Sequence, residues 1–282
     1  MMVSTMSTCS AGHVLEWKSQ ATHNSLPWGN LTTAAAIFFS GSNASKVIRL
    51  FEILKLQTFS KRTFFRIQKS YLVPSVVEVW NFERERNVVE RLGKQLILGG
   101  DARCDSPGYS AKYGSYSLMD LDSQTVLDIQ LIQCNEVKGS THMELEGLKR
   151  GLLKLKAERL NIKSLITDRH VMVKKFMKGE EEIIHNFDVW HFAKGVSKKL
   201  EGLAKKKGAE AIKPWIKSVS THLYWAASTS ANDGEMKLAK WQSLTRHIRN
   251  IHTHPSKRYP ECRHGPLEDN QRNWMEEGTC QN

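Results

Sequence analysis

Two aspartates, Asp101 and Asp168, are the residues whose type and placement best fit catalysis. Asp101 ends the apolar run QLILGGD and Asp168 ends SLITD, and both runs are predicted to be strands. Carboxylates that meet at one edge of a sheet suit a two-metal Mg²⁺ site, in which one ion activates the attacking oxygen and the other stabilises the leaving oxygen. For either residue alone, a turn or a helix cap is the open alternative.

A second candidate pair is Asp188 and His191 in the motif DVWH, which follows Asp168 by 20 residues. Residues three apart lie side by side on a helix. The functional interpretation is that His191 contacts the scissile phosphate or orients the active site, with Asp188 supporting it. The alternative is that Asp188 caps a helix while His191 packs against Trp190 or Phe187.

Three neighbours of the proposed acids are weaker candidates. Asp105 lies four residues after Asp101, and the loop CDSPGYS could fold it back toward the metal. Arg103 and His170 could reach a phosphate, although simple exposure to solvent explains them equally well.

Histidines and cysteines suggest zinc at two places. Near the end of the chain, the run HIRNIHTHPSKRYPECRHG contains His252, His254, Cys262 and His264, whose imidazole and thiol ligands suit Zn²⁺ better than Mg²⁺. A basic loop rich in histidine is the alternative. Near the start, Cys9 and His13 resemble the second half of a zinc module, and we expect this half-site to be empty because structural zinc needs four ligands.

The elements that must position the acids follow from hydrophobic patterning. From Gln95 the sequence predicts three antiparallel strands, the last two joined by a turn at residues 122–124, then an amphipathic helix, a fourth strand at SLITD and a helix from Val171. This order is that of a ribonuclease H core. The fold class is therefore predicted to be α/β, a ribonuclease H-like mixed sheet with a helical N-terminal region and a helical insertion.

The region before the sheet is predicted to be helical. An apolar helix at residues 31–40 with Asn30 as its N-cap is followed by two or three more helices up to about Lys94. The segment Ser60–Arg66 opens one of them with three basic side chains, a layout compatible with a helix-turn-helix on DNA, and a solvated helix face is the alternative.

Charge points to a polyanionic partner. The chain of 282 residues has a formal net charge of +12, and residues 191–260 contain 14 Lys or Arg against 4 Asp or Glu. Lysine and arginine bind nucleic acid by releasing counterions from phosphates. Trp215, Tyr224 and Trp225 interrupt this basic region, and we expect aromatic side chains inside and lysines outside.

The cysteine count is odd, and neither a signal peptide nor a membrane-spanning run is found, which favours a reducing intracellular compartment and no membrane partner.

The segments 100–120, 164–177 and 187–200 resemble eukaryotic DDE transposases of the Kolobok, hAT and Mutator-like assemblage. The resemblance implies that Asp101 and Asp168 are the first two catalytic acids. It also implies that Asp188 and His191 form a family motif in which an Asp or a Cys is followed, after two other residues, by a His. It also implies DNA as the partner and the nucleus as the location. A homo-oligomer is left open.

The third acid of that family is a glutamate in a context like SLEAFHS, and no such segment is found here. The late candidates, Glu235, Glu268, Glu276 and Glu277, lie in other contexts. We therefore expect the chain to be truncated at both ends, and to bind DNA without Mg²⁺-dependent cleavage, because two carboxylates balance two divalent cations poorly.

Four regions summarise this interpretation: 1–29, a remnant of a zinc module; 30–94, helical and compatible with DNA binding; 95–195, the catalytic core; and 196–282, a basic and incomplete helical insertion. The predicted function is that of a transposase-derived DNA-binding protein, ancestrally a Mg²⁺-dependent DNA cleavage and strand-transfer enzyme. A catalytically inactive DNA-binding or protein-interaction module is the first alternative. A nuclease acting on RNA or on RNA–DNA hybrids is the second, and it is disfavoured because no recognisable reader of the 2′-hydroxyl is found.

Overall fold

The computed structural model describes residues 2–23, 26–231, 233–265 and 274–275. The chain divides into two compact units, Met1–Glu90 and Arg91–Asn282. This boundary lies four residues before the one predicted from the sequence, because Arg91 belongs to the second unit through its ion pair with Asp120.

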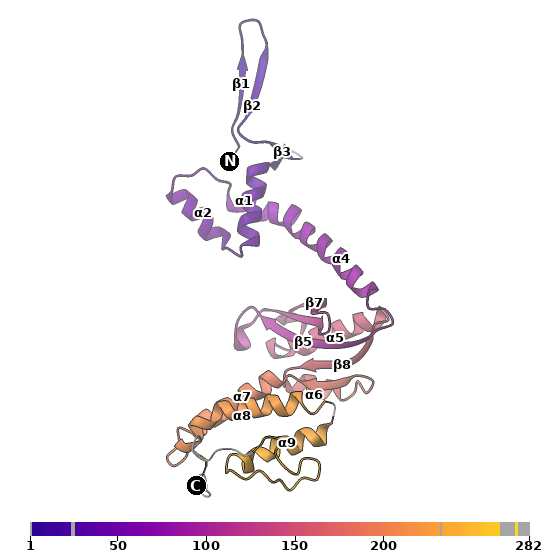
Figure 1. The fold of residues 1–282 in the computed structure, drawn as a ribbon. Helices are drawn as coiled ribbons and strands as arrows, with labels where there is room; N and C mark the ends of the chain where they lie inside the picture. Colours follow the sequence, from indigo (N-terminus) through magenta and orange to yellow (C-terminus); the bar gives the residue numbers. More distant parts are fainter. Residues whose placement is uncertain (1, 24–25, 232, 266–273, 276–282) are drawn as a thin grey trace. The chain divides into compact units, whose positions relative to one another are not determined.

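The first unit is a β-hairpin followed by helices (Figure 1). Strands β1 (Ser4–Thr8) and β2 (Val14–Lys18) form the hairpin, and β3 (Thr22–His23) pairs with β4 (Leu26–Pro27). The helices are α1 (Trp28–Phe39), α2 (Ala44–Ile53), α3 (Lys61–Ile67), a π-helical turn (Gln68–Leu72) and α4 (Val73–Val89). The predicted helical region is therefore present, and Ser60 caps α3 by accepting a hydrogen bond from the backbone of Thr63.

The core of the first unit lies between the apolar faces of α1, α2 and α3. Its buried residues are Leu26, Ala34, Ile37, Ile48, Phe59, Phe64, Ile67 and Leu72. The predicted cap at Asn30 is wrong, because α1 already begins at Trp28 with Pro27 in the N-cap position. The proline fixes its own φ and ends the preceding strand pair, so the helix starts three residues earlier than the polar residue suggested.

The second unit is built on a five-stranded mixed sheet with the order β7-β6-β5-β8-β9. Its strands are β5 (Gln95–Cys104), β6 (Tyr113–Asp120), β7 (Thr125–Gln133), β8 (Asn161–Thr167) and β9 (Ile184–Phe187). The first three are antiparallel neighbours, whereas β8 and β9 run parallel to β5. The predicted antiparallel meander, the fourth strand and the α/β class are confirmed. The fifth strand was not predicted, because IHNF is short and carries no alternating apolar pattern.

Helix α5 (Met143–Ala157) packs on β6 and β7 at unusually close range. Gly147 and Gly151 lie on the face that meets β6, and a Cβ added at Gly147 would be 2.4 Å from the Cβ of Tyr116. Because residues three and four apart share a helix face, the face that touches the sheet also includes Glu144. The two glycines thus bring the first turn of α5 close to the sheet.

The remaining helices are α6 (Val171–Met177), α7 (Val189–Leu203), α8 (Ile216–Ser228) and α9 (Gly234–His247), with short 3₁₀ turns at Gly108–Ser110, Cys134–Glu136, Ser140–His142 and Glu210–Trp215. Helix α7 packs against α8, and α8 packs against α9. The lysines of α7 are exposed, as expected, but Tyr224 is also 38% exposed and Lys240 is buried against Trp225. Among the described residues, no helix has the length and apolar character needed to span a membrane.

Candidate active site and candidate metal centre

Asp101 and Asp168 occupy equivalent positions on two adjacent parallel strands. The pairing of β5 with β8 sets Gly99 opposite Ile166, so each aspartate comes two residues after a paired position. Asp168 follows the last residue of β8, as predicted. Asp101 does not end its strand, because β5 continues to Cys104 through its pairing with β6.

Glu144, in the first turn of α5, is a third carboxylate that acts on this site, and no sequence pattern predicted it. Burial, together with the negative charges of Asp168 and Asp101, raises the pKa of the Glu144 carboxyl to about 7. When protonated, Glu144 shares a hydrogen bond with the Asp168 side chain. Three acids from β5, α5 and the end of β8 therefore act on one another electrostatically.

Tyr116, on β6, is a buried residue whose hydroxyl feels the negative charges of these acids. Its side chain is 1% exposed, and its hydroxyl is buried without a hydrogen-bond partner. Burial raises the pKa of the Tyr116 hydroxyl, and the charges of Glu144, Asp101 and Asp168 raise it further. Gly100 makes room for the hydroxyl, since a Cβ there would be 2.3 Å from its oxygen. A buried hydroxyl without a hydrogen-bond partner calls for an explanation, and a role in a functional site near these acids would provide one.

Asp188 and His191 are both engaged at the start of α7. Asp188 caps this helix by accepting a hydrogen bond from the Trp190 backbone, and its other carboxylate oxygen lies 2.7 Å from Nδ1 of His191. The His191 ring also packs edge-on against Trp190 at 4.7 Å. This is the geometry of the structural alternative, although the backbone N–H of Asp188 donates to the Thr167 carbonyl and so places the pair beside Asp168.

The three weaker candidates have distinct environments. Asp105 accepts a hydrogen bond from the Lys112 backbone within its own loop. Arg103 is exposed and lies two residues after Asp101 on β5, so both side chains project from the same face of the strand. The backbone of His170 donates to Asp168, and its Nδ1 is buried without a hydrogen-bond partner.

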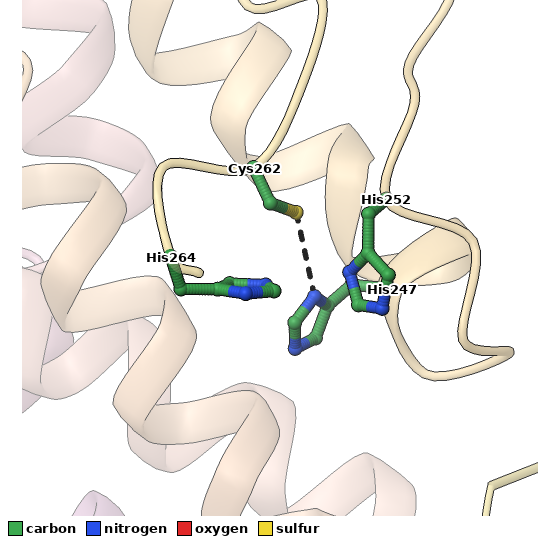
Figure 2. Close-up of side chains that lie close together, drawn as sticks. All are labelled: His247, His252, Cys262 and His264. Carbon is green, nitrogen blue, oxygen red and sulfur yellow. Dashed lines mark hydrogen bonds between the residues drawn. The ribbon is translucent and has the colours of Figure 1, made fainter. Parts of the chain in front are cut away.

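A cluster of histidine and cysteine at the end of α9 could hold a metal such as zinc. It consists of His247, His252, Cys262 and His264, which we call the His/Cys cluster, and one potential ligand atom from each lies within 4.8 Å of the others. Figure 2 shows the side chains converging from the end of α9 and from the following loop. In the part of the chain that the structure describes, no other group of three or more histidine, cysteine, aspartate or glutamate side chains comes close enough together for one ion, and Asp101, Glu144 and Asp168 do not form such a group.

His254, predicted as one of the four zinc ligands, lies outside the His/Cys cluster, and His247 takes its place. The loop folds back on itself, so that the Cys262 backbone N–H donates to the His252 carbonyl and sets these two residues opposite each other. His254 lies two residues further along and stacks on Tyr259 at 5.3 Å. Its Nε2 is nevertheless 3.2 Å from the Cys262 sulfur.

The N-terminal pair Cys9 and His13 lies at the exposed turn of the β1–β2 hairpin. The Cys9 sulfur is 3.4 Å from Nδ1 of His13. Within the described ranges, no further histidine, cysteine or acid joins them in a group able to hold a metal.

Of the late glutamates considered as a third acid, Glu235 lies in the first turn of α9 and pairs with Arg258. Glu268, Glu276 and Glu277 lie outside the described residues.

The signal that could have identified Glu144 was its position in the sequence MELEGLKRG, three residues before a helical glycine that allows close packing on the sheet. For His247, the signal was a histidine in the last turn of a helix, five residues before His252.

The chain was compared with models of protein families and with curated proteins, and neither comparison found a match.

Proposed function

We propose that this chain is a transposase-derived, nuclear DNA-binding protein that cleaves phosphodiester bonds. Asp101, Glu144 and Asp168 do not lie close enough together for one ion in this structure, and they would have to draw together to bind Mg²⁺. The observation that supports this best is the raised pKa of Glu144, caused by burial and by the two aspartates. Negative charges that disfavour ionisation of a neighbouring carboxyl also favour a nearby cation, and Mg²⁺ would supply that positive charge. Bound there, Mg²⁺ would supply an activated water and stabilise the leaving oxygen.

The strand order supports the same proposal at the level of the fold. Three antiparallel strands followed by two parallel ones, with the first strand in the centre, is the order expected of a ribonuclease H-like core. In this arrangement the first and fourth strands are neighbours, as are β5 and β8 here. The proposed ligands come from these strands and from the helix that follows the meander.

Glu144 is an alternative source of the third carboxylate, whose apparent absence led to the expectation of an inactive chain. That expectation rested on a missing third carboxylate, which the family's context placed late in the sequence. Glu144 supplies a third negative charge from α5 instead, so that the charge balance with two divalent cations improves before the substrate phosphate arrives. Arg103, exposed beside Asp101, is a candidate for contacting that phosphate.

The experiment is cleavage of supercoiled plasmid DNA by the full chain in Mg²⁺ or Mn²⁺. We expect nicked product from the wild type. Cleavage should fall by more than about 100-fold in Glu144→Gln, Asp101→Asn and Asp168→Asn, because even the outer partners of metal ligands contribute about 10–100-fold.

Two variants serve as matched controls. Glu146→Gln changes an acid in the same turn of α5, but one that pairs with Arg150 at 2.8 Å. Asp105→Asn changes an acid near Asp101 that serves its own loop. Both should cleave like the wild type. DNA binding without cleavage by the wild type would instead favour the inactive DNA-binding module.

A further inference from the structure

The geometry of the His/Cys cluster fits a tetrahedral ion. With zinc–nitrogen distances of about 2.0 Å and a zinc–sulfur distance of about 2.3 Å, the nitrogen and sulfur ligands of a tetrahedral site lie about 3.5 Å apart. The Cys262 sulfur and Nδ1 of His247 are 3.5 Å apart (Figure 2). The three imidazole rings lie 4.8–5.3 Å from one another, centroid to centroid, and each pair is nearly perpendicular.

Hydrogen bonds outside the cluster orient the rings of His252 and His264 for metal binding. Nε2 of His252 donates to the Asn250 side chain at 2.8 Å, so its Nδ1 carries the lone pair, and this Nδ1 is buried with no hydrogen-bond partner. Nδ1 of His264 donates to the Gly265 carbonyl at 2.8 Å, which leaves Nε2 as the acceptor. Metal-bound histidines are characteristically oriented in this way, by a partner on the other ring nitrogen.

We propose that His247, His252, Cys262 and His264 bind one structural Zn²⁺ through three imidazole nitrogens and one thiolate. Four protein ligands leave no open coordination position, so the ion is structural rather than catalytic. A thiolate with imidazoles, and no carboxylate in the cluster, selects zinc over Mg²⁺ or Ca²⁺. On binding, the Cys262 thiol releases its proton to solvent and the sulfur forms the bond to zinc.

The ion would fasten the loop after α9 to the helix itself. His247 belongs to the last turn of α9, His252 follows the turn at Asn250, and Cys262 with His264 lies at the far end of the loop. The loop is also held by a β-bridge between Thr253 and Glu261 and by the ion pairs of Arg258 with Asp233 and Glu235. The buried Tyr259 packs against Trp225 of α8. Metal binding would therefore contribute to the folding of this segment.

The test is titration of the full-length chain, freed of metal with a chelator, with Co²⁺ and then with Zn²⁺. Co²⁺ reports its geometry through visible absorption and reports a thiolate ligand through a charge-transfer band in the near ultraviolet. We expect one equivalent of Co²⁺ to give a tetrahedral spectrum with that band, and Zn²⁺ to displace it. Absence of a tetrahedral spectrum in the wild type overturns the proposal.

Variants identify the ligands. Cys262→Ser should lose the charge-transfer band, whereas Cys9→Ser, which changes another free cysteine, should keep it. His247→Asn should lose binding and His254→Asn should keep it. The assigned thiolate would be contradicted if Cys9→Ser lost the band or Cys262→Ser kept it. The assigned imidazole would be contradicted if His254→Asn lost binding while His247→Asn kept it.

A further variant tests the outer hydrogen bond. Asn250 has a φ of +58°, a conformation that glycine tolerates, so Asn250→Gly removes the side chain without straining the turn. We expect its affinity for Zn²⁺ to fall about 10–100-fold, with the tetrahedral Co²⁺ spectrum retained. An affinity equal to that of the wild type would show that Asn250 does not orient His252.

Discussion

At the scale of single residues, two acids in the same unit illustrate how surroundings separate a structural role from a functional one. Asp120 is buried in an ion pair with Arg91, whose Nε is 2.9 Å from a carboxylate oxygen. Glu144 faces two other carboxylates, and its pKa is raised to about 7. A buried acid with a cationic partner stabilises the apo fold, whereas an acid among acids destabilises it unless a cation is present.

The Asp120–Arg91 pair predicts an acid-dependent stability. Burial would raise the pKa of Asp120, but hydrogen bonds from Ser123 and Arg91 outweigh it and hold the pKa below its ordinary value. Because the unfolded state takes up the proton first as the pH falls, this stabilisation is present above the ordinary pKa of about 3.9 and is lost below it.

Asp120→Asn should therefore lower the free energy of unfolding by about 3–5 kcal/mol at neutral pH, since the buried Arg91 charge loses its carboxylate. Its stability should also depend less on pH than that of the wild type below about pH 4. Denaturant unfolding measured across this range checks both statements. An equal loss of stability with acid in both proteins would show that Asp120 does not contribute.

At the scale of elements, the approach of α5 to the sheet decides where Glu144 lies. A Cβ at Gly147 would be 2.4 Å from the Tyr116 Cβ and 2.8 Å from Cδ1 of Ile132. Both atoms belong to buried side chains of β6 and β7 that cannot move aside easily. The helix is thus close to the sheet because it has no side chain at this position.

Gly147→Ala is expected to destabilise the second unit by about 1–3 kcal/mol through overpacking, despite the better helix propensity of alanine. The matched control is Gly195→Ala in α7, where a Cβ would meet nothing within 4 Å. This control should be stabilised by up to about 1 kcal/mol. Thermal unfolding of the two variants compares them directly, and equal stability changes would contradict the close packing of α5.

At the scale of the whole molecule, the excess positive charge lies mainly in one region of the sequence. Residues 191–260 carry most of it, and Lys194, Lys198 and Lys199 are exposed on α7. Lys61, Arg62 and Arg66 form a smaller exposed basic group on α3 in the first unit. Either group could contact DNA phosphates, and salt dependence distinguishes them.

Replacing Lys194, Lys198 and Lys199 together by glutamine should weaken DNA binding and reduce the slope of log affinity against log salt by up to about 2.7, that is, about 0.9 for each lost phosphate contact. The same replacement at Lys61, Arg62 and Arg66 should leave the slope unchanged. Fluorescence anisotropy with a short duplex at several salt concentrations measures both. A change confined to the second variant would assign DNA contact to α3 instead.

The sequence by itself determined the order of the elements from β5 to α6 in the second unit, but not β9, which follows them. Short apolar runs identified β5 and β8, strand patterns identified β6 and β7, and helical spacing identified α5, because these patterns reflect which side of each element is buried. It also indicated that the carboxylates of Asp101 and Asp168 belong to adjacent strands. Their equivalent positions follow from the register of β5 and β8.

The tertiary structure decided which residues join these two clusters. Glu144 comes near Asp168 because glycines on α5 allow close packing against Tyr116, a contact across about 30 residues that no local pattern contains. His247 replaces His254 because the loop sets Cys262 opposite His252 and returns the chain to the end of α9. Spacing along the chain indicates residue types that can bind a metal, but ligation depends on distances that only packing sets.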